Sequence, residues 1–145
     1  MVNSLKVLAL ITLLGFISLI QAQQDSAFKV IVHNDNPISS ISKAKLSNMF
    51  LKKETKWENG RKAIPVDQKD TAVVRVAFSK AIHNKAISAV KSYWQQKIFS
   101  GRDVPPPELD SDSAVISYVQ ANADAIGYVS GNVPTGKFKV LVITE

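Results

Sequence analysis

Short apolar, β-branched segments alternate along the chain with segments that carry an apolar stripe at helical spacing, and this alternation limits the fold most strongly. Strands are predicted at 28–33, 63–66, 125–130 and 137–144, and helices at 42–51, 70–82, 85–99 and 111–123. Because each helix must bury its stripe against a sheet, we expect an α/β fold, a three-layer sandwich with a mixed sheet. The unbroken run 140–143 predicts a final strand buried on both faces.

Polar residues with short side chains mark where the helices begin. Ser39, Ser40 and Ser42 offer caps for the first helix, Asp70 or Thr71 for the second, and Ser111 or Asp112 for the last. Three aromatic residues, Tyr93, Trp94 and Tyr128, are expected to pack in the interior. Trp57 lies in a polar segment beside Asn59-Gly60, so we expect its ring to be partly exposed.

The first 22 residues have the layout of a secretory signal peptide. Lys6 precedes an apolar run from Val7 to Ile20, and Ala22 offers a small residue for cleavage. The alternative is an uncleaved membrane anchor, but the run is shorter than the roughly 20 residues that a spanning helix needs. We therefore expect one exported domain at 23–145, periplasmic or secreted, and without a stable membrane span after cleavage.

The residues available for chemistry are few. There is no cysteine, which excludes disulfides, thiolate catalysis and thiolate metal sites. His33 could act as a general base beside Asp35, although a histidine at a strand end is more often a partly exposed surface residue. His83 closes a predicted helix, where an imidazolium complements the helix dipole. No metal-ligand spacing or nucleotide-binding loop occurs, so we expect neither a metal, a cofactor nor an enzyme.

The net charge of +6 at first suggests nucleic acid as a partner. The basic residues are spread along the chain, and acidic residues are interleaved even in the densest group, at 52–62. A solvated face explains this distribution better than a nucleic-acid surface, and an anionic ligand remains the sharper alternative. We expect no nucleic-acid partner.

The segment after the second predicted strand is a candidate oxyanion site. In an open α/β sheet, ligands gather at the carboxyl ends of strands, and a helix N-terminus presents free N–H groups to an anion. Thr71 offers a hydroxyl and Lys69 a charge, while Arg75 lies one turn further on. The other interpretation is that Asp70 caps the helix and Lys69 is solvated. Ser39 and Ser40 form a second candidate site after the first strand.

A series of motifs resembles the substrate-binding proteins of phosphate ABC transporters, which have the type 2 periplasmic binding-protein fold. In chain order the motifs are Ile41-Ser42-x-x-x-Leu46-x-x-Met49-Phe50-Leu51, Trp57-x-Asn59-Gly60, Ile64-Pro65-Val66-Asp67, Phe78, Tyr93-Trp94, Phe99-x-Gly101, Pro106, Val115-x-x-Tyr118-Val119 and Ala125-Ile126-Gly127-Tyr128-Val129. Members of this family have two lobes that clamp the anion. This chain is long enough for about one lobe and resembles the second.

The resemblance implies a non-catalytic binding domain, with phosphate or a related oxyanion as its ligand and an ABC transporter as its partner. The family holds phosphate with a Ser-Gly-Thr turn at a helix start, and that turn corresponds here to Lys69-Asp70-Thr71, of which only Thr71 is kept. The predicted ligand-binding residues are Ser39, Ser40, Lys69, Thr71 and Arg75. The alternative is an envelope protein-interaction module that keeps the fold but has lost the phosphate site.

Overall fold

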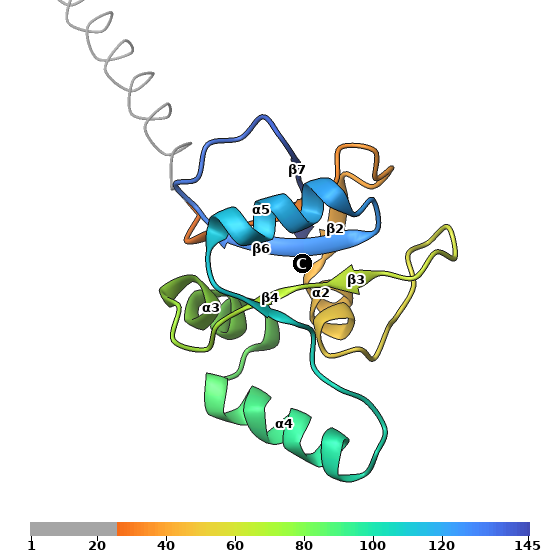
Figure 1. The fold of residues 1–145 in the computed structure, drawn as a ribbon, viewed down its shortest axis with the longest axis vertical. Coiled ribbons are helices and arrows are strands. Elements are labelled where there is room, and N and C mark those ends of the chain that lie inside the picture. The colour runs from red at the N-terminus through yellow and green to blue at the C-terminus, as the bar shows by residue number, and fades with distance from the viewer. Residues whose placement is uncertain (1–25) are drawn as a thin grey trace, which may run out of the picture.

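The computed structural model describes residues 26–145, and the predicted signal peptide at 1–22 lies outside the described residues. A four-stranded mixed sheet in the order β3-β6-β1-β7 forms the centre of the domain (Figure 1). β1 pairs antiparallel with β6 and β7, whereas β3 runs parallel to β6. The strands are β1 (Phe28–Val32), β3 (Ile64–Pro65), β6 (Ala125–Ser130) and β7 (Lys139–Val140).

Two smaller parallel ladders extend this sheet, and helices cover both of its faces. β2 (Ser40–Ser42) pairs with β8 (Val142–Thr144), and β4 (Asp67–Gln68) pairs with β5 (Glu108–Leu109). The helices are α2 (Lys43–Phe50), α3 (Val73–Phe78), the π-helical turn η1 (Ser79–His83), α4 (Ile87–Phe99) and α5 (Asp112–Ala121). No helix within residues 26–145 is long and apolar enough to cross a membrane.

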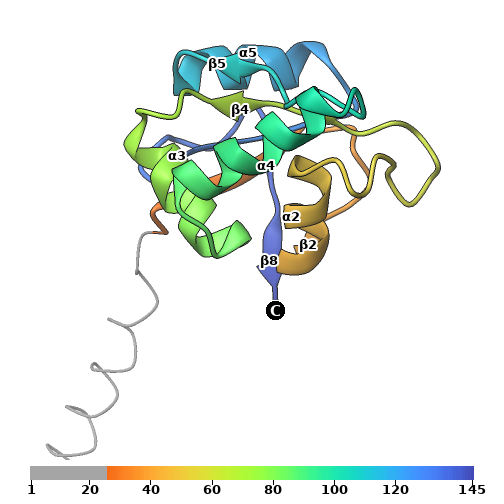
Figure 2. The ribbon, with the colours of Figure 1, turned by 90° about the horizontal axis from the view of Figure 1, so that it is seen from below.

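The sheet separates two hydrophobic clusters, which confirms the expected three-layer α/β sandwich with a mixed sheet. In β1, Val30 and Val32 point into the cluster on the α2 and α3 side, while Ile31 joins Val115 and Val119 of α5 on the other side. This alternation follows from the two-residue period of a strand. Figure 2 shows α5 on one side of the strands and α2, α3 and α4 on the other.

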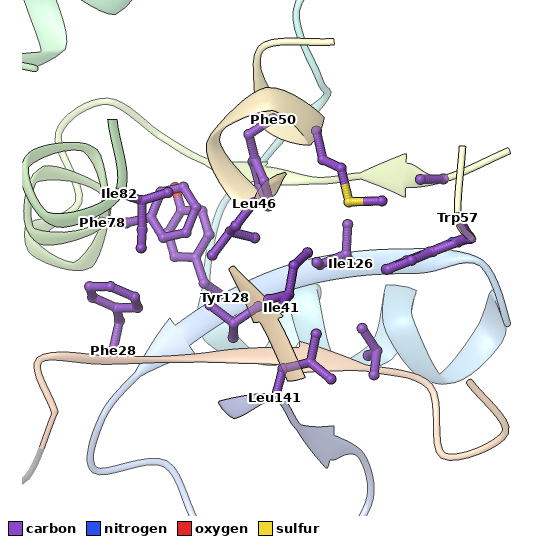
Figure 3. Close-up of a cluster of buried hydrophobic side chains, with 14 of the residues drawn as sticks. Phe28, Ile41, Leu46, Phe50, Trp57, Phe78, Ile82, Ile126, Tyr128 and Leu141 are labelled. Carbon is purple, nitrogen blue, oxygen red and sulfur yellow. The ribbon is translucent and has the colours of Figure 1, made fainter. Parts of the chain in front are cut away.

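An aromatic group forms the middle of the larger cluster. The rings of Phe78 and Tyr128 stack with centroids 3.9 Å apart, and Phe50 lies 4.8 Å from Phe78 (Figure 3). Tyr128 and Trp94 are buried, as predicted, and Tyr93 is half-buried beside Trp94. Trp57 is only 5% exposed, so the expectation of a partly exposed ring is wrong. Its indole Nε1 donates to the carbonyl of Asp124 at 3.0 Å, which allows the ring to be buried.

The predicted continuous last strand is also wrong. The chain pairs with β1 through β7, crosses at Leu141 and then pairs with β2 through β8. Leu141 is buried and donates its amide to Val30, but Val142 is 64% exposed. Within the run 140–143, Val140 packs against the cluster on the α5 side, whereas Leu141 and Ile143 pack against the other cluster. The run is not a strand buried on both sides.

Two of the three predicted caps are confirmed. Ser42 accepts from the amide of Lys45 at the start of α2, and Ser111 accepts from that of Ala114 at the start of α5. The second helix differs, because α3 begins at Val73 after Ala72, and no side chain caps it. Neither Asp70 nor Thr71 therefore caps this helix.

Candidate functional site

The structure places the two groups of predicted ligand-binding residues at different ends of the main sheet. β1 ends where β6 begins, because Val32 pairs with Ile126, and the connection containing Ser39 and Ser40 leaves from that end. Gln68 bonds to Tyr128 near the other end of β6, and Lys69, Thr71 and Arg75 follow it. The antiparallel direction of β1 causes this separation, since the carboxyl ends of antiparallel strands do not meet.

The connection between β4 and α3 carries charges that are already paired. The Nζ of Lys69 lies 2.7 Å from Asp110, and the carboxylate of Asp70 lies 2.6 Å from the Nζ of Lys91. A hydrogen bond and charge attraction from Asp110 raise the pKa of Lys69, and the same effects from Lys91 lower the pKa of Asp70. Thr71 is exposed. The cation offered to an anion here is therefore shared with a carboxylate.

The first turn of α3 is apolar. Its cap and first two residues are Ala72, Val73 and Val74, so no side-chain hydroxyl lies at the helix start. Val73 is 86% exposed. Thr71, the hydroxyl residue predicted for this position, precedes the helix by two residues. The N-terminus of α3 thus offers backbone N–H groups without the side-chain donors that the resemblance implied.

Arg75 is buried under this connection. Its Nη1 lies 2.8 Å from the carboxylate of Asp67 and donates to the carbonyl of Gln68 at 2.7 Å. Both charged side chains are about 95% buried. Arg75 does not reach back to a surface ligand, because it neutralises an internal carboxylate.

Asp67 lies at the centre of a buried polar network that the sequence did not reveal. Its carboxylate accepts from the hydroxyl of Tyr128 and from the amide of Gln68. Burial raises the pKa of Asp67 to about 6, and the opposing attraction of Arg75 keeps it from rising further. The side chain of Gln68 continues the network, donating to Asp112 at 2.8 Å and to the carbonyl of Tyr128. The network joins β4, α3, α5 and β6.

The two histidines occupy different environments. The Nδ1 of His33 accepts from the amide of Asp35 in an exposed turn, in agreement with the interpretation as a strand-end residue. His83 is buried, and its Nδ1 lies 2.8 Å from the hydroxyl of Ser47 on α2. Burial lowers the pKa of His83 to about 4, with a smaller contribution from Arg75, so the ring is neutral. The prediction of an imidazolium that complements a helix end is therefore wrong.

Ser39 and Ser40 line a hollow of about 530 Å³. The hollow lies between residues 36–40, which follow β1, and residues 57–59, which include Trp57. A smaller neighbouring hollow extends it along β2 to Lys45. Asn36, which is 5% exposed, lines the larger hollow. The larger hollow is thus lined by two of the predicted ligand-binding residues, Ser39 and Ser40.

A large apolar side chain is exposed at the end of α4. Phe99 is 95% exposed, and Ile98 beside it is half-exposed. α4 packs on the domain through Val90 and Trp94 against Leu51. Its last turn therefore projects beyond the layer that it covers.

Within residues 26–145, no group of three or more metal-ligating side chains converges. In the loop before α5, Asp110 pairs with Lys69, and Asp112 accepts from Gln68 and from the amide of Ser130.

The sequence matches no protein-family model and no curated protein sequence. Solved structures are nonetheless similar. A protein from Clostridium perfringens, described as a phosphate ABC transporter substrate-binding protein with bound phosphate, superimposes with a TM-score of 0.65 at 21% identity. An ABC-type phosphate transport receptor from Vibrio cholerae gives 0.64 at 15%, and PstS from Borrelia burgdorferi gives 0.60 at 12%.

These similarities cover most of this chain and less than half of each neighbour. They extend over 81%, 81% and 82% of this chain and over 44%, 46% and 47% of the three neighbours. The chain therefore has the α/β fold of about one lobe of such a binding protein. This result confirms the resemblance at the level of fold.

Proposed function

We propose that this chain is an exported, non-catalytic binding module that keeps the fold of a solute-binding lobe and acts by binding a protein in the cell envelope. The observation that carries the proposal is the internal pairing of the β4–α3 connection. All four charged side chains of segment 67–75 have a partner of opposite charge, and they are Asp67, Lys69, Asp70 and Arg75. An anion would have to break these pairs to obtain a cation.

The energetics favour this alternative over phosphate capture. An exposed charge pair contributes about 0–1 kcal/mol, whereas even millimolar affinity requires about 4 kcal/mol. Lys69 is exposed and shared with Asp110, and Arg75 is committed to Asp67. Oxyanion binding by Ser39, Ser40, Lys69, Thr71 and Arg75 stays a prediction, supported by the fold and by the phosphate named for its structural neighbours.

The end of α4 supports the protein-binding role. Phe99 and Ile98 expose apolar surface beside Lys97 and Arg102, and neither cation lies within 4 Å of a carboxylate among the described residues. Phenylalanine and arginine are enriched in protein interfaces. We call Lys97, Ile98, Phe99 and Arg102 the α4 patch. Its expected partner is a protein whose apolar pocket is flanked by carboxylates.

A crosslinking experiment in the producing cell tests the role of the patch. A photo-crosslinking amino acid at Phe99 should give one discrete protein adduct, and the same amino acid at exposed Lys80 on η1 should not. Adding Lys97→Glu and Arg102→Glu should reduce the adduct at least fivefold, because like charges then face the partner. Equal labelling at both positions, or recovery of lipid adducts alone, would contradict the protein-binding proposal.

Phosphate titration tests the rival function independently. A ligand at about 100 times its Kd adds about 2.7 kcal/mol to the free energy of unfolding, which raises Tm by several degrees. We expect no selective increase in Tm with millimolar phosphate, arsenate or sulfate at low salt. A phosphate-selective increase that Lys69→Ala or Thr71→Ala reduces would establish the oxyanion site.

A further inference from the structure

The hollow between residues 36–40 and 57–59 combines polar and apolar lining, and we infer that it binds a neutral, hydroxyl-rich molecule of the size of a mono- or disaccharide. This inference is independent of the protein-binding role of the α4 patch. The volume of about 530 Å³ falls in the range of small-molecule sites, and the smaller hollow along β2 adds about 240 Å³. The class of ligand follows from four properties of the lining: the Asn36 donor, the other polar side chains, the net charge and the apolar surface.

Asn36 supplies a donor that is fixed in position. Its Oδ1 accepts from the amide of Ile38 at 3.1 Å, which orients the side-chain amide. Among residues 26–145, its Nδ2 makes no hydrogen bond to the protein, although the residue is only 5% exposed. No fully buried side-chain nitrogen or oxygen of the described residues lacks a partner, so this Nδ2 keeps some contact with solvent, and Asn36 lines the hollow. An oxygen of a ligand would satisfy it.

The backbone around Asn36 is held rigidly. The Nζ of Lys139 donates to the carbonyls of Asn36 and Ile38, and the amide of Asn36 donates to the carbonyl of His33. These bonds use the loop's own acceptors and leave its side chains for the ligand. A preformed site loses less entropy on binding than a mobile loop.

Three further polar side chains surround the same space. Ser39 and Ser40 are exposed, and within the described residues their hydroxyls have no hydrogen-bond partner. The Oδ1 of Asn59 accepts from the amide of Arg61 at 3.0 Å, which leaves its Nδ2 available. Hydroxyls both donate and accept, and amide nitrogens donate. This set complements ligand hydroxyls, which also do both.

The charge of the lining is balanced. Glu58 is the carboxylate of the hollow, and its Oε1 lies 3.1 Å from the Nζ of Lys45 on α2. The pair leaves no net charge to attract an anion or a cation. Phosphate, sulfate or a free amine would therefore gain little there over water, which favours a neutral ligand.

The rest of the lining is apolar. Trp57, Pro37 and Ile38 contribute carbon surface, and the bond from the indole of Trp57 to Asp124 fixes the ring. A sugar ring presents C–H groups and hydroxyls together, and so matches a wall that alternates carbon with donors. An alanine peptide carries no side-chain hydroxyl to meet these polar groups, and so matches this wall less well.

Side-chain and backbone NMR resonances provide the test. The full exported protein, labelled with ¹⁵N, is titrated separately with glucose, N-acetylglucosamine, maltose, tri-alanine and sodium phosphate, each to about 20 mM, which covers millimolar Kd values. We expect at least one saccharide to cause saturable shifts of the Asn36 side-chain amide, the Trp57 indole N–H and the Ser40 amide. We expect no saturable shift of these signals with tri-alanine or phosphate.

Matched variants connect the shifts with the proposed contacts. Asn36→Asp keeps the oxygen that accepts from Ile38 and removes the free donor, and Ser40→Ala removes a hydroxyl that supports no fold contact. Each should weaken saccharide binding at least fivefold, whereas Ser113→Ala on exposed α5 should leave it unchanged. The inference is overturned if none of the three saccharides shifts these resonances, if tri-alanine or phosphate saturates them instead, or if Ser40→Ala binds as the parent does.

Discussion

Replacing His83 by glutamine should make the protein more resistant to acid. The folded protein holds His83 neutral with a pKa of about 4, whereas the unfolded chain has the ordinary value of 6.5. The stability that this neutral ring contributes is complete above pH 6.5. It is lost as the pH falls toward 4, because the unfolded state then binds the proton more readily. Glutamine cannot titrate and can still hydrogen-bond to Ser47.

The magnitude follows from the two pKa values. At pH 4.5, His83 reduces the free energy of unfolding by about 2–3 kcal/mol relative to pH 7.5. Asp67 acts in the opposite direction, since burial raises its folded pKa to about 6, above the ordinary value of 3.8. Its protonation adds stability as the pH falls below 6, so the two effects oppose each other in the parent protein.

Urea unfolding followed by tryptophan fluorescence at pH 7.5 and 4.5 measures the difference. Between these pH values, His83→Gln should gain about 2–3 kcal/mol relative to the parent, which shifts the urea midpoint by about 1 M. Ser47→Ala is the control, because it removes the hydrogen bond to His83 and keeps the titrating ring. Parallel pH profiles for the parent and His83→Gln would show that folding does not lower the pKa of His83.

Three further substitutions test the packing and the polar network. Gly127→Ala should destabilise the fold by about 1–3 kcal/mol in thermal unfolding, because its Cβ would lie 2.6 Å from a methyl group of Val115 on α5; an unchanged Tm would show that α5 moves freely. Arg75→Met should lower the free energy of unfolding at pH 7.5 by about 3–5 kcal/mol, since it leaves the carboxylate of Asp67 buried without a counter-charge, and adding Asp67→Asn should recover part of this loss, because no charge is then buried alone. Trp57→Phe should cost about 1–3 kcal/mol in urea unfolding, because it leaves a buried carbonyl without its indole donor; a loss below 0.5 kcal/mol would indicate that water replaces the indole.

The local elements were predictable because their signals are local. The short apolar segments predicted β1 and β6. The helical stripes predicted α2, α4 and α5 to within a few residues. Ser42 and Ser111 cap helices because a short side chain can reach a free amide three residues on. None of these features depends on a distant part of the chain.

Two of the errors involve contacts between distant segments. Trp57 is buried because its indole reaches Asp124, 67 residues further along the chain. Val142 is exposed because the last segment changes partner from β1 to β2 at Leu141. At these positions burial depends on a hydrogen bond or a strand pairing with a segment far away in the sequence, which a local pattern does not contain.

The candidate site shows the same division. The sequence identified Lys69, Thr71, Arg75, Ser39 and Ser40 as residues able to bind an oxyanion, from their types and their positions after strands. Their assembly depended on strand direction, and β1 runs antiparallel to β6, so the two groups are apart. Arg75 also forms a buried salt bridge with Asp67. The sequence carries no signal for this pair, because it forms only when α3 folds over β4.

The α/β class and most of the helices and longer strands could be predicted from the sequence, because hydrophobic period and capping act over a few residues. Contacts between distant segments set which charges are unpaired, where the hollows lie and which side chains face solvent. Ion pairs such as Arg75–Asp67 form between segments that only the completed fold brings within 3 Å. The hollow beside Asn36 likewise exists only because the segments around β2 and Trp57 meet there.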